Sequence, residues 1–96
     1  MPKGYLLSAH RSPADPNKRS AYLKLAGPAI IKAGGKMLAS TSNVKAYENG
    51  KAEQTVLVEF ESFDKAIEAY ESEDYQKALE ALDGGADRDF RLFEGV

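Results

Sequence analysis

Two stretches of the chain are rich in apolar residues and have the length of a β-strand, and in neither would one face of the strand be fully polar. These stretches are Tyr5–Arg11 and Gln54–Phe60. A third extended segment, Phe90–Glu94, follows the glycine pair near the end of the chain. The pattern therefore predicts strands at the beginning, just after the middle and at the end.

Two shorter extended pieces, Lys36–Ser40 and Val44–Glu48, precede the second of these strands. Together they predict one bent or bulged strand. The Asn49-Gly50 pair that follows is a strong signal for a tight β-hairpin turn. This strand is therefore expected to pair with Gln54–Phe60.

A first helix is predicted after Asp15-Pro16. The aspartate can cap free backbone amides, and proline in the first turn loses no hydrogen bond. Gly27-Pro28 lies inside this helix and predicts a kink, because proline cannot donate to the preceding turn. The apolar stripe at helical spacing consists of Tyr22, Leu25, Ala26, Ala29 and Ala33.

The second helical region is predicted to break and restart. Ser62 is a candidate N-cap, and the apolar positions after it follow the i, i+3, i+4, i+7 rule. Ser72 offers a second cap, so a new helix is expected from that point. The two apolar stripes are Phe63, Ala66, Ile67 and Tyr70, then Tyr75, Ala78, Leu79 and Leu82.

The resulting order is βαββαβ, with the interrupted helical region counted as one helix. The split βαβ arrangement predicts a ferredoxin-like α+β domain, in which a four-stranded antiparallel sheet carries both helices on one face. The other face of such a sheet has no cover.

That uncovered face is expected to be partly apolar. Alternation along Gln54–Phe60 puts Val56, Val58 and Phe60 under the helices and Thr55, Leu57 and Glu59 on the open side. A side chain such as Leu57 stabilises by roughly 1.5–3 kcal/mol when it is buried. The sequence therefore predicts a two-fold homodimer whose sheets face each other across a shared, partly polar interior.

Composition narrows the classes of protein. The 96 residues form a single domain, 1–96, and 43% apolar with 29% charged residues is typical of a globular protein. A formal net charge of −2 gives no basic surface for nucleic acid. The absence of cysteine excludes disulfides, zinc–thiolate sites and thiol catalysis. The apolar run at the N-terminus is too short for a signal peptide or a membrane span, so a cytoplasmic location is expected.

The chain also resembles a known family over essentially its whole length. The residues that carry the resemblance are Gly4-Tyr5, Asp15-Pro16, Tyr22, Gly34-Gly35-Lys36, the run from Val58 to Phe63, Ala66, Tyr70, Ser72, Tyr75-Gln76 and Glu94-Gly95-Val96. In order and spacing they resemble the family known as domain of unknown function 1330, in the dimeric α/β-barrel superfamily.

This resemblance implies a ferredoxin-like protomer, a homodimer, and a cavity between sheet and helices or between sheets. Related branches of the superfamily include cofactor-independent monooxygenases, small-ring isomerases and haem enzymes. Members of the family often carry an arginine soon after the second helical segment, where this chain has Leu82-Asp83-Gly84. Arg88 and Arg91 lie nearby without aligning cleanly.

Glu59 and His10 are the candidate catalytic residues. Glu59 lies near a strand end on the face expected to line the dimer interior, where a partly buried carboxylate can act as a base. Strand parity is expected to place His10 on the same face, so that the pair could move a proton. The alternatives are a structural glutamate and a solvent-exposed histidine at a strand end. One histidine provides no metal site, and no cofactor is expected.

Tyr22, Tyr70, Tyr75 and Arg88 are the candidate ligand-binding residues. The tyrosine hydroxyls could orient a small aromatic or carbonyl ligand, or the rings could simply form the edge of the core. Arg88 could contact an anion, or it could form a surface ion pair with Asp87, Asp89 or Glu94.

Three functions remain open from the sequence. The first is a homodimeric domain that binds a small organic ligand. The second is a cofactor-independent monooxygenase or isomerase that acts on a small aromatic or keto substrate with Glu59 or His10 as base. The third is a purely structural or partner-binding module.

Overall fold

A computed structural model describes residues 2–96. The elements in chain order are β1 (Gly4–His10), α1 (Pro16–Lys32), β2 (Lys36–Thr41), β3 (Thr55–Phe60), α2 (Phe63–Glu71), α3 (Glu73–Leu82) and β4 (Arg88–Glu94). The predicted break in the second helical region is confirmed, so the order is βαββααβ.

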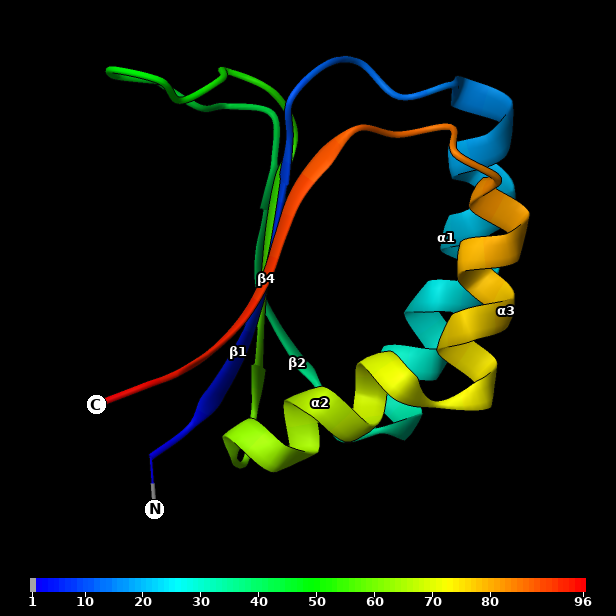
Figure 1. The fold of residues 1–96 in the computed structure, drawn as a ribbon, viewed down its shortest axis with the longest axis vertical. Coiled ribbons are helices and arrows are strands. Elements are labelled where there is room, and N and C mark those ends of the chain that lie inside the picture. The colour runs from blue at the N-terminus through cyan, green and yellow to red at the C-terminus, as the bar shows by residue number, and fades with distance from the viewer. Residues whose placement is uncertain (1) are drawn as a thin grey trace.

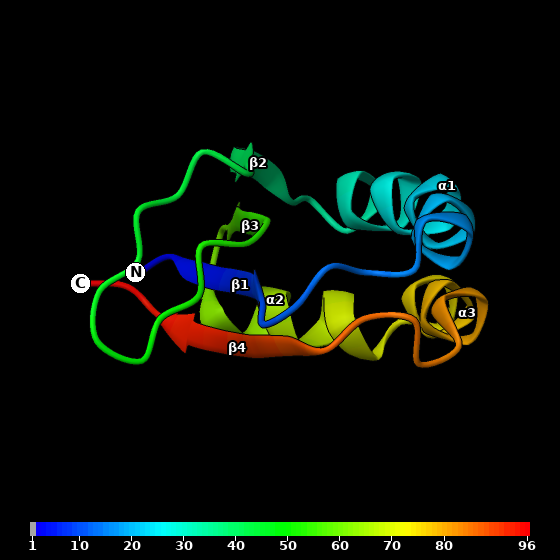
Figure 2. The ribbon, with the colours of Figure 1, turned by 90° about the horizontal axis from the view of Figure 1, so that it is seen from above.

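The four strands form one antiparallel sheet in the order β2-β3-β1-β4. This is the predicted ferredoxin-like arrangement, with β1 and β3 in the centre. Figure 1 shows the sheet edge-on, with α1 and α3 standing to its right and α2 closing its lower end. From above, α1 and α3 lie side by side, and the opposite side of the sheet carries no helix (Figure 2).

Side-chain caps start all three helices where the sequence predicted them. The Asp15 carboxylate accepts a hydrogen bond from the Lys18 amide at 3.0 Å, and the Ser62 hydroxyl accepts one from the Lys65 amide at 3.2 Å. Ser72 accepts from the Tyr75 amide at 3.2 Å and donates to the Ala69 carbonyl at 2.8 Å. Ser72 therefore ends α2 and begins α3 with one side chain.

The two faces of the sheet differ in cover. The helix-facing positions of the central strands are Leu6, Ser8 and His10 in β1 and Val56, Val58 and Phe60 in β3. The open face carries Tyr5, Leu7 and Ala9 beside Thr55, Leu57 and Glu59, all partly exposed. The predicted assignment of β3 residues to the two faces is therefore confirmed.

The tightest packing lies under α2. Phe60 is 1% exposed, and Ala66 and Ala69 of α2 are equally buried. Because alanine side chains are small, α2 can approach the strands closely. Val58 and Tyr75 are also almost fully buried and belong to the same core cluster.

α1 is held in place mainly by α3. Lys18 and Asp83 form an ion pair at 3.3 Å at one end of α1, and Lys32 and Asp74 form another at 3.3 Å at the other end. Tyr22 bonds to α3 between them, as described below. The buried faces of the two helices carry alanines, which suits their close approach. α1 is thus positioned by its neighbouring helix and stands away from the strands.

Two local predictions were wrong. Val44–Glu48 is not a strand, because β2 ends where Thr41 pairs with Thr55 and residues 42–54 form a loop. The Asn49-Gly50 signal serves a turn inside this loop, where the Gly50 amide donates to the Tyr47 carbonyl at 2.9 Å. The predicted bulge does occur, but at Met37–Ala39.

Leu25 was predicted on the buried stripe of α1 and is 45% exposed. Ile30 takes a buried position instead, because the helix presents one face to α3 and another to the sheet. The helix continues through Gly27-Pro28 without interruption.

Candidate functional site

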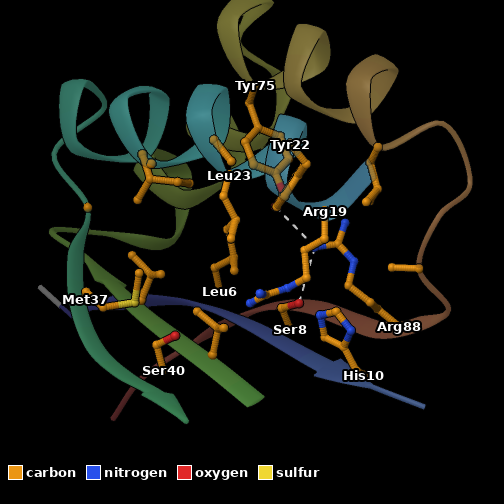
Figure 3. A pocket seen from close by; sticks show the side chains of 18 of the residues that line it. Leu6, Ser8, His10, Arg19, Tyr22, Leu23, Met37, Ser40, Tyr75 and Arg88 are labelled. Carbon is orange, nitrogen blue, oxygen red and sulfur yellow. Dashed lines mark hydrogen bonds between the residues drawn. The ribbon is translucent and has the colours of Figure 1, made fainter. Parts of the chain in front are cut away.

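A cavity of about 170 Å³ lies between α1 and the helix-facing side of the sheet. It exists because α1 rests on α3, so that the space between α1 and strands β1, β2 and β3 is incompletely filled (Figure 3). Most of its wall is apolar. The apolar lining includes Leu6, Leu23, Ile30, Met37, Val56 and Val58.

The sheet-facing stripe of α1 supplies one wall. Arg19, Tyr22, Leu23, Ala26 and Ile30 follow the i, i+3, i+4, i+7, i+11 spacing of one helix face, and all line the cavity. At the mouth, Leu23 and Met37 are 44% and 55% exposed. The site is thus apolar from its entrance inward.

Polar side chains gather at one end of the cavity around Arg88. One guanidinium nitrogen, Nη1, donates to the Tyr22 hydroxyl at 3.1 Å and to the Ser8 hydroxyl at 3.3 Å. The guanidinium carbon lies 5.1 Å from the ring centroid of Tyr22 and 4.8 Å from that of Phe90, which is the range of cation–π contacts. Arg88 is therefore half-buried and held by four partner groups in a fixed position.

Arg88 forms no ion pair with any carboxylate in residues 2–96. The predicted surface pairing with Asp89 belongs instead to Arg91, which donates from Nε to the Asp89 carboxylate at 2.9 Å on the other face of the sheet. Burial acts to lower the pKa of Arg88, but the hydroxyls of Tyr22 and Tyr75 outweigh it and raise this pKa. The guanidinium accordingly carries its full positive charge inside the site.

Tyr22 and Tyr75 meet above Arg88. Their hydroxyl oxygens are 2.6 Å apart, and their rings pack edge to face with centroids 6.0 Å apart. Tyr75 is 1% exposed, and burial together with the neighbouring Tyr22 raises its pKa, so it stays protonated. The hydrogen bond between the two tyrosines joins α1 to α3. The hydrogen bond from Arg88 to the Tyr22 hydroxyl connects this pair to β4.

His10 lies in the same polar end, beside Ser8 and Arg88 (Figure 3). It is only 7% exposed, so the expectation of a solvent-exposed strand-end histidine was wrong. Burial is the main cause that lowers its pKa; the charges of Arg88 and Arg19 act in the same direction, and Glu53 opposes them. A neutral imidazole therefore faces the cavity at pH 7.

Glu59 does not share a face with His10, which corrects the predicted proton-transfer pair. Glu59 pairs in register with Tyr5 on the open face, and the Tyr5 hydroxyl donates to its carboxylate at 3.1 Å. His10 has the parity of Leu6 and Ser8, which face the helices. The two candidate bases are thus separated by the sheet.

Tyr70 does not line the cavity. Its ring packs on Tyr75 and Phe90, with centroid distances of 5.3 Å to each, and so supports the cluster from behind. Of the six predicted site residues, the structure brings together His10, Tyr22, Tyr75 and Arg88.

Sequence reasoning missed Arg19 and Ser8. Figure 3 shows Arg19 extending from α1 into the space above Ser8, where Arg88 arrives from β4. The i, i+3 spacing of Arg19 and Tyr22, which places both on one helix face, was a usable signal for this position. The assembled end of the cavity is positively charged and rich in hydrogen-bond donors, so it can hold an acceptor group while the apolar walls hold a carbon skeleton.

Residues 3–96 match the family described as Domain of unknown function (DUF1330). The chain belongs to this family. The match extends over nearly the entire sequence, as the resemblance of its motifs had predicted. None of the curated proteins with which the chain was compared matches it.

Solved structures share the fold at low sequence identity. The methylated RPA0582 protein has a TM-score of 0.73 at 15% identity, over 100% of this chain and 82% of that one. The RPA0582 protein of unknown function from Rhodopseudomonas palustris gives 0.67 at 19% identity, over 97% and 80%. A Nitrosomonas europaea protein named as a candidate antibiotic biosynthesis monooxygenase gives 0.55 at 11%, over 100% and 99%. The protomer of this DUF1330 protein therefore shares its ferredoxin-like fold with these structures.

No helix in residues 2–96 has both the length and the apolar character needed to cross a membrane. In the same range, no three His, Asp or Glu side chains gather in a way that could hold a metal ion.

Proposed function

We propose that the protein is a homodimeric small-molecule-binding protein and that the cavity under α1 is its ligand site. The observation that carries this proposal is an apolar cavity of about 170 Å³ that ends in a fixed cluster of polar groups. An engineered cavity of roughly 150 Å³ lined by Leu, Ile and Phe takes up benzene. The cavity of this protein thus has the size for one ring or a short branched chain, and ligand sites commonly combine apolar walls with a few convergent polar groups.

The homodimer is supported by the open face of the sheet. Tyr5 stacks on Phe93 with centroids 5.4 Å apart, and Leu7 and Leu57 pair beside them at the centre of this face. A partly apolar sheet surface of this kind favours burial against a second copy. In that arrangement Glu59 would face the partner protomer.

Ligand screening by thermal shift tests the binding function. The panel contains small aromatic acids, quinones, flavin and haem, because a ligand that binds only the folded protein raises the melting temperature. Ser40→Phe places a ring in the cavity and should abolish the shift. Thr41→Phe is the matched control, because Thr41 follows Ser40 on β2 but faces away from the cavity. Ser40 and Thr41 are both exposed, and each substitution removes one exposed hydrogen bond. Equal shifts in both variants would exclude this cavity as the site.

Sedimentation tests the homodimer. Leu57→Arg puts a charge at the centre of the open face and should produce monomers at micromolar concentration. Leu25→Arg changes an exposed leucine of α1 and should leave the assembly unchanged. A wild-type protein that sediments as a monomer would refute the homodimer.

A second candidate is a cofactor-independent monooxygenase or isomerase. The observation that favours it is His10, a buried and neutral imidazole that faces the cavity and can accept a proton near pH 7. The Nitrosomonas europaea protein provides a candidate activity to assay, although its 11% identity supports the fold alone. In this case His10→Gln should abolish turnover while ligand binding persists, and Glu59→Gln, on the opposite face, should have little effect. Unchanged turnover in His10→Gln would remove this candidate.

A further inference from the structure

We infer that the ligand of this cavity is a compact organic acid, with its carboxylate between Arg88 and Arg19 and its apolar body against the wall of α1 and β3. This inference rests on the proposed ligand site and adds the chemical class of the ligand. It is carried by the charge, the hydrogen-bond inventory and the size of the cavity.

The charges at the polar end are uncompensated. Arg88 and Arg19 reach the same end of the cavity from opposite walls (Figure 3), and neither forms an ion pair in residues 2–96. Lys18, Lys32 and Arg91, in contrast, each have a carboxylate partner within 4 Å. Glu53 acts on His10 through its charge but pairs with neither arginine. Arg19 and Arg88 are both partly buried, and two cations that face the same partly buried space are stabilised by an anion between them.

The hydrogen-bond inventory also calls for an acceptor. Tyr22 and Tyr75 have two hydroxyl hydrogens and share one hydrogen bond, so one hydrogen has no acceptor among the described residues. Only Nη1 of Arg88 has protein acceptors, which leaves the N–H groups of its other nitrogens unused. No side-chain nitrogen or oxygen in residues 2–96 is both fully buried and without a partner, so the unpaired nitrogens of Arg88 are not sealed in the core, and Arg88, Tyr22 and Tyr75 all line the cavity. A carboxylate has two acceptor oxygens and fits the planar guanidinium fork.

The remaining volume limits the body of the acid. Leu6, Ile30, Met37 and Val58 offer no hydrogen bonds, and about 170 Å³ holds a single ring or a chain of comparable volume. Sugars and nucleotides would leave several polar groups without partners against these walls, which costs free energy for each group. A monocyclic aromatic acid such as phenylacetate fits both the size and the polarity.

The experiment compares phenylacetate with phenylacetamide, which has nearly the same shape but no charge. Binding is measured by calorimetry and by NMR shifts of the methyl groups of Leu6, Ile30 and Val58. Wild type should bind the acid at least about tenfold more tightly than the amide, because hydrogen bonds to charged groups are the stronger ones. Arg88→Met should bring the ratio to about 1, mainly by weakening acid binding. Arg91→Met, on the same strand but the opposite face, should keep the wild-type ratio.

Each outcome decides between the two proposals. Equal affinities for acid and amide in wild type would overturn the carboxylate assignment while the ligand site stands. Failure of both probes to bind would overturn the ligand site as well. Tighter binding of phenyl phosphate than of phenylacetate would replace the carboxylate by a phosphate. If Arg88→Met does not fold, Arg19→Met provides the test, since Arg19 makes no hydrogen bond that the fold requires; an unchanged ratio in that variant would overturn the assignment.

Discussion

Under α2 the sheet and the helix touch directly, whereas under α1 they enclose a cavity. Phe60 and Ala66 in the first region are at most 1% exposed, while Leu23 and Met37 in the second remain open to solvent. Both regions are covered by helices of one chain and share strands β1 and β3. The difference comes from what each helix rests on: α2 packs on strands, and α1 packs on α3.

The closely packed core and the proposed ligand site thus lie in different regions of a domain of 96 residues. The α2 half supplies the closely packed core. The α1 half keeps open space because α1 packs on α3, where Tyr22 bonds to Tyr75, and is not drawn onto the sheet. A cavity can then persist beside a well-packed core, since the helix above it is held from the side.

The largest expected effect tests this difference in packing. Phe60→Ala should lower the free energy of unfolding by about 3–5 kcal/mol, because it leaves a hole in a filled region. Leu23→Ala, at the mouth of the cavity, should cost less than about 1 kcal/mol, since the side chain is already partly exposed. Urea unfolding followed by circular dichroism, at one protein concentration, measures both. Similar costs would mean that the two halves are packed alike.

The next effect lies at the boundary between the halves. Ser72→Ala should lower the free energy of unfolding by about 1–2 kcal/mol, because Ser72 caps α3 and also closes the end of α2. Ser72→Asp keeps the capping acceptor and should recover most of this loss. Ser12→Ala, at an exposed position outside both helices, is the control and should change little. A Ser72→Ala variant as stable as wild type would show that the break between α2 and α3 is determined by side-chain packing and not by the Ser72 hydrogen bonds.

Local signals predicted most of the fold. Asp15, Ser62 and Ser72 each start a helix through a bond to the amide three residues later, which depends only on neighbouring sequence. Alternation also placed Val58 and Leu57 on the correct faces of β3. These features need no knowledge of the rest of the chain.

The errors arose where distant segments meet. Parity within β1 could not tell whether Tyr5 or Leu6 would stand opposite Glu59, because that register joins residues 54 positions apart. The polar end of the cavity also combines α1, β1 and β4, so Arg88 looked like one charge among exposed acidic neighbours. Only the tertiary arrangement shows that Asp89 forms its ion pair with Arg91 and that Arg88 faces the cavity.

A smaller effect concerns the bond that ties α1 to α3. Tyr75→Phe removes the 2.6 Å hydrogen bond to Tyr22 and should lower the free energy of unfolding by about 0.5–1 kcal/mol. A double-mutant cycle with Tyr22→Phe measures the coupling of the two hydroxyls. Tyr47 is 69% exposed, so Tyr47→Phe is the control and should change the free energy of unfolding little. Additive effects in the cycle would mean that this bond does not hold α1 over the cavity.

The smallest effect is the pH dependence of the α1 half. The pKa of His10 is lowered in the folded protein by burial and by the charges of Arg88 from β4 and Arg19 from α1, against Glu53 from the loop before β3. The unfolded chain, with an ordinary histidine pKa of about 6.5, therefore takes up a proton first as the pH falls. Stability from this group is present above about pH 6.5 and is lost below it as the pH approaches the folded pKa.

Unfolding free energies at pH 7.5 and pH 5.5 measure this loss, and His10→Gln should show a smaller difference between the two values. Phenylacetate should reduce the loss in wild type, because a carboxylate beside Arg88 and Arg19 offsets the charges that oppose protonation of His10. The α2 half contains no comparable buried group, so Phe60→Ala should lower stability equally at both pH values. If His10→Gln keeps the full pH dependence of wild type, the titrating group lies outside the cavity and the pH response belongs to the whole domain rather than to its open half.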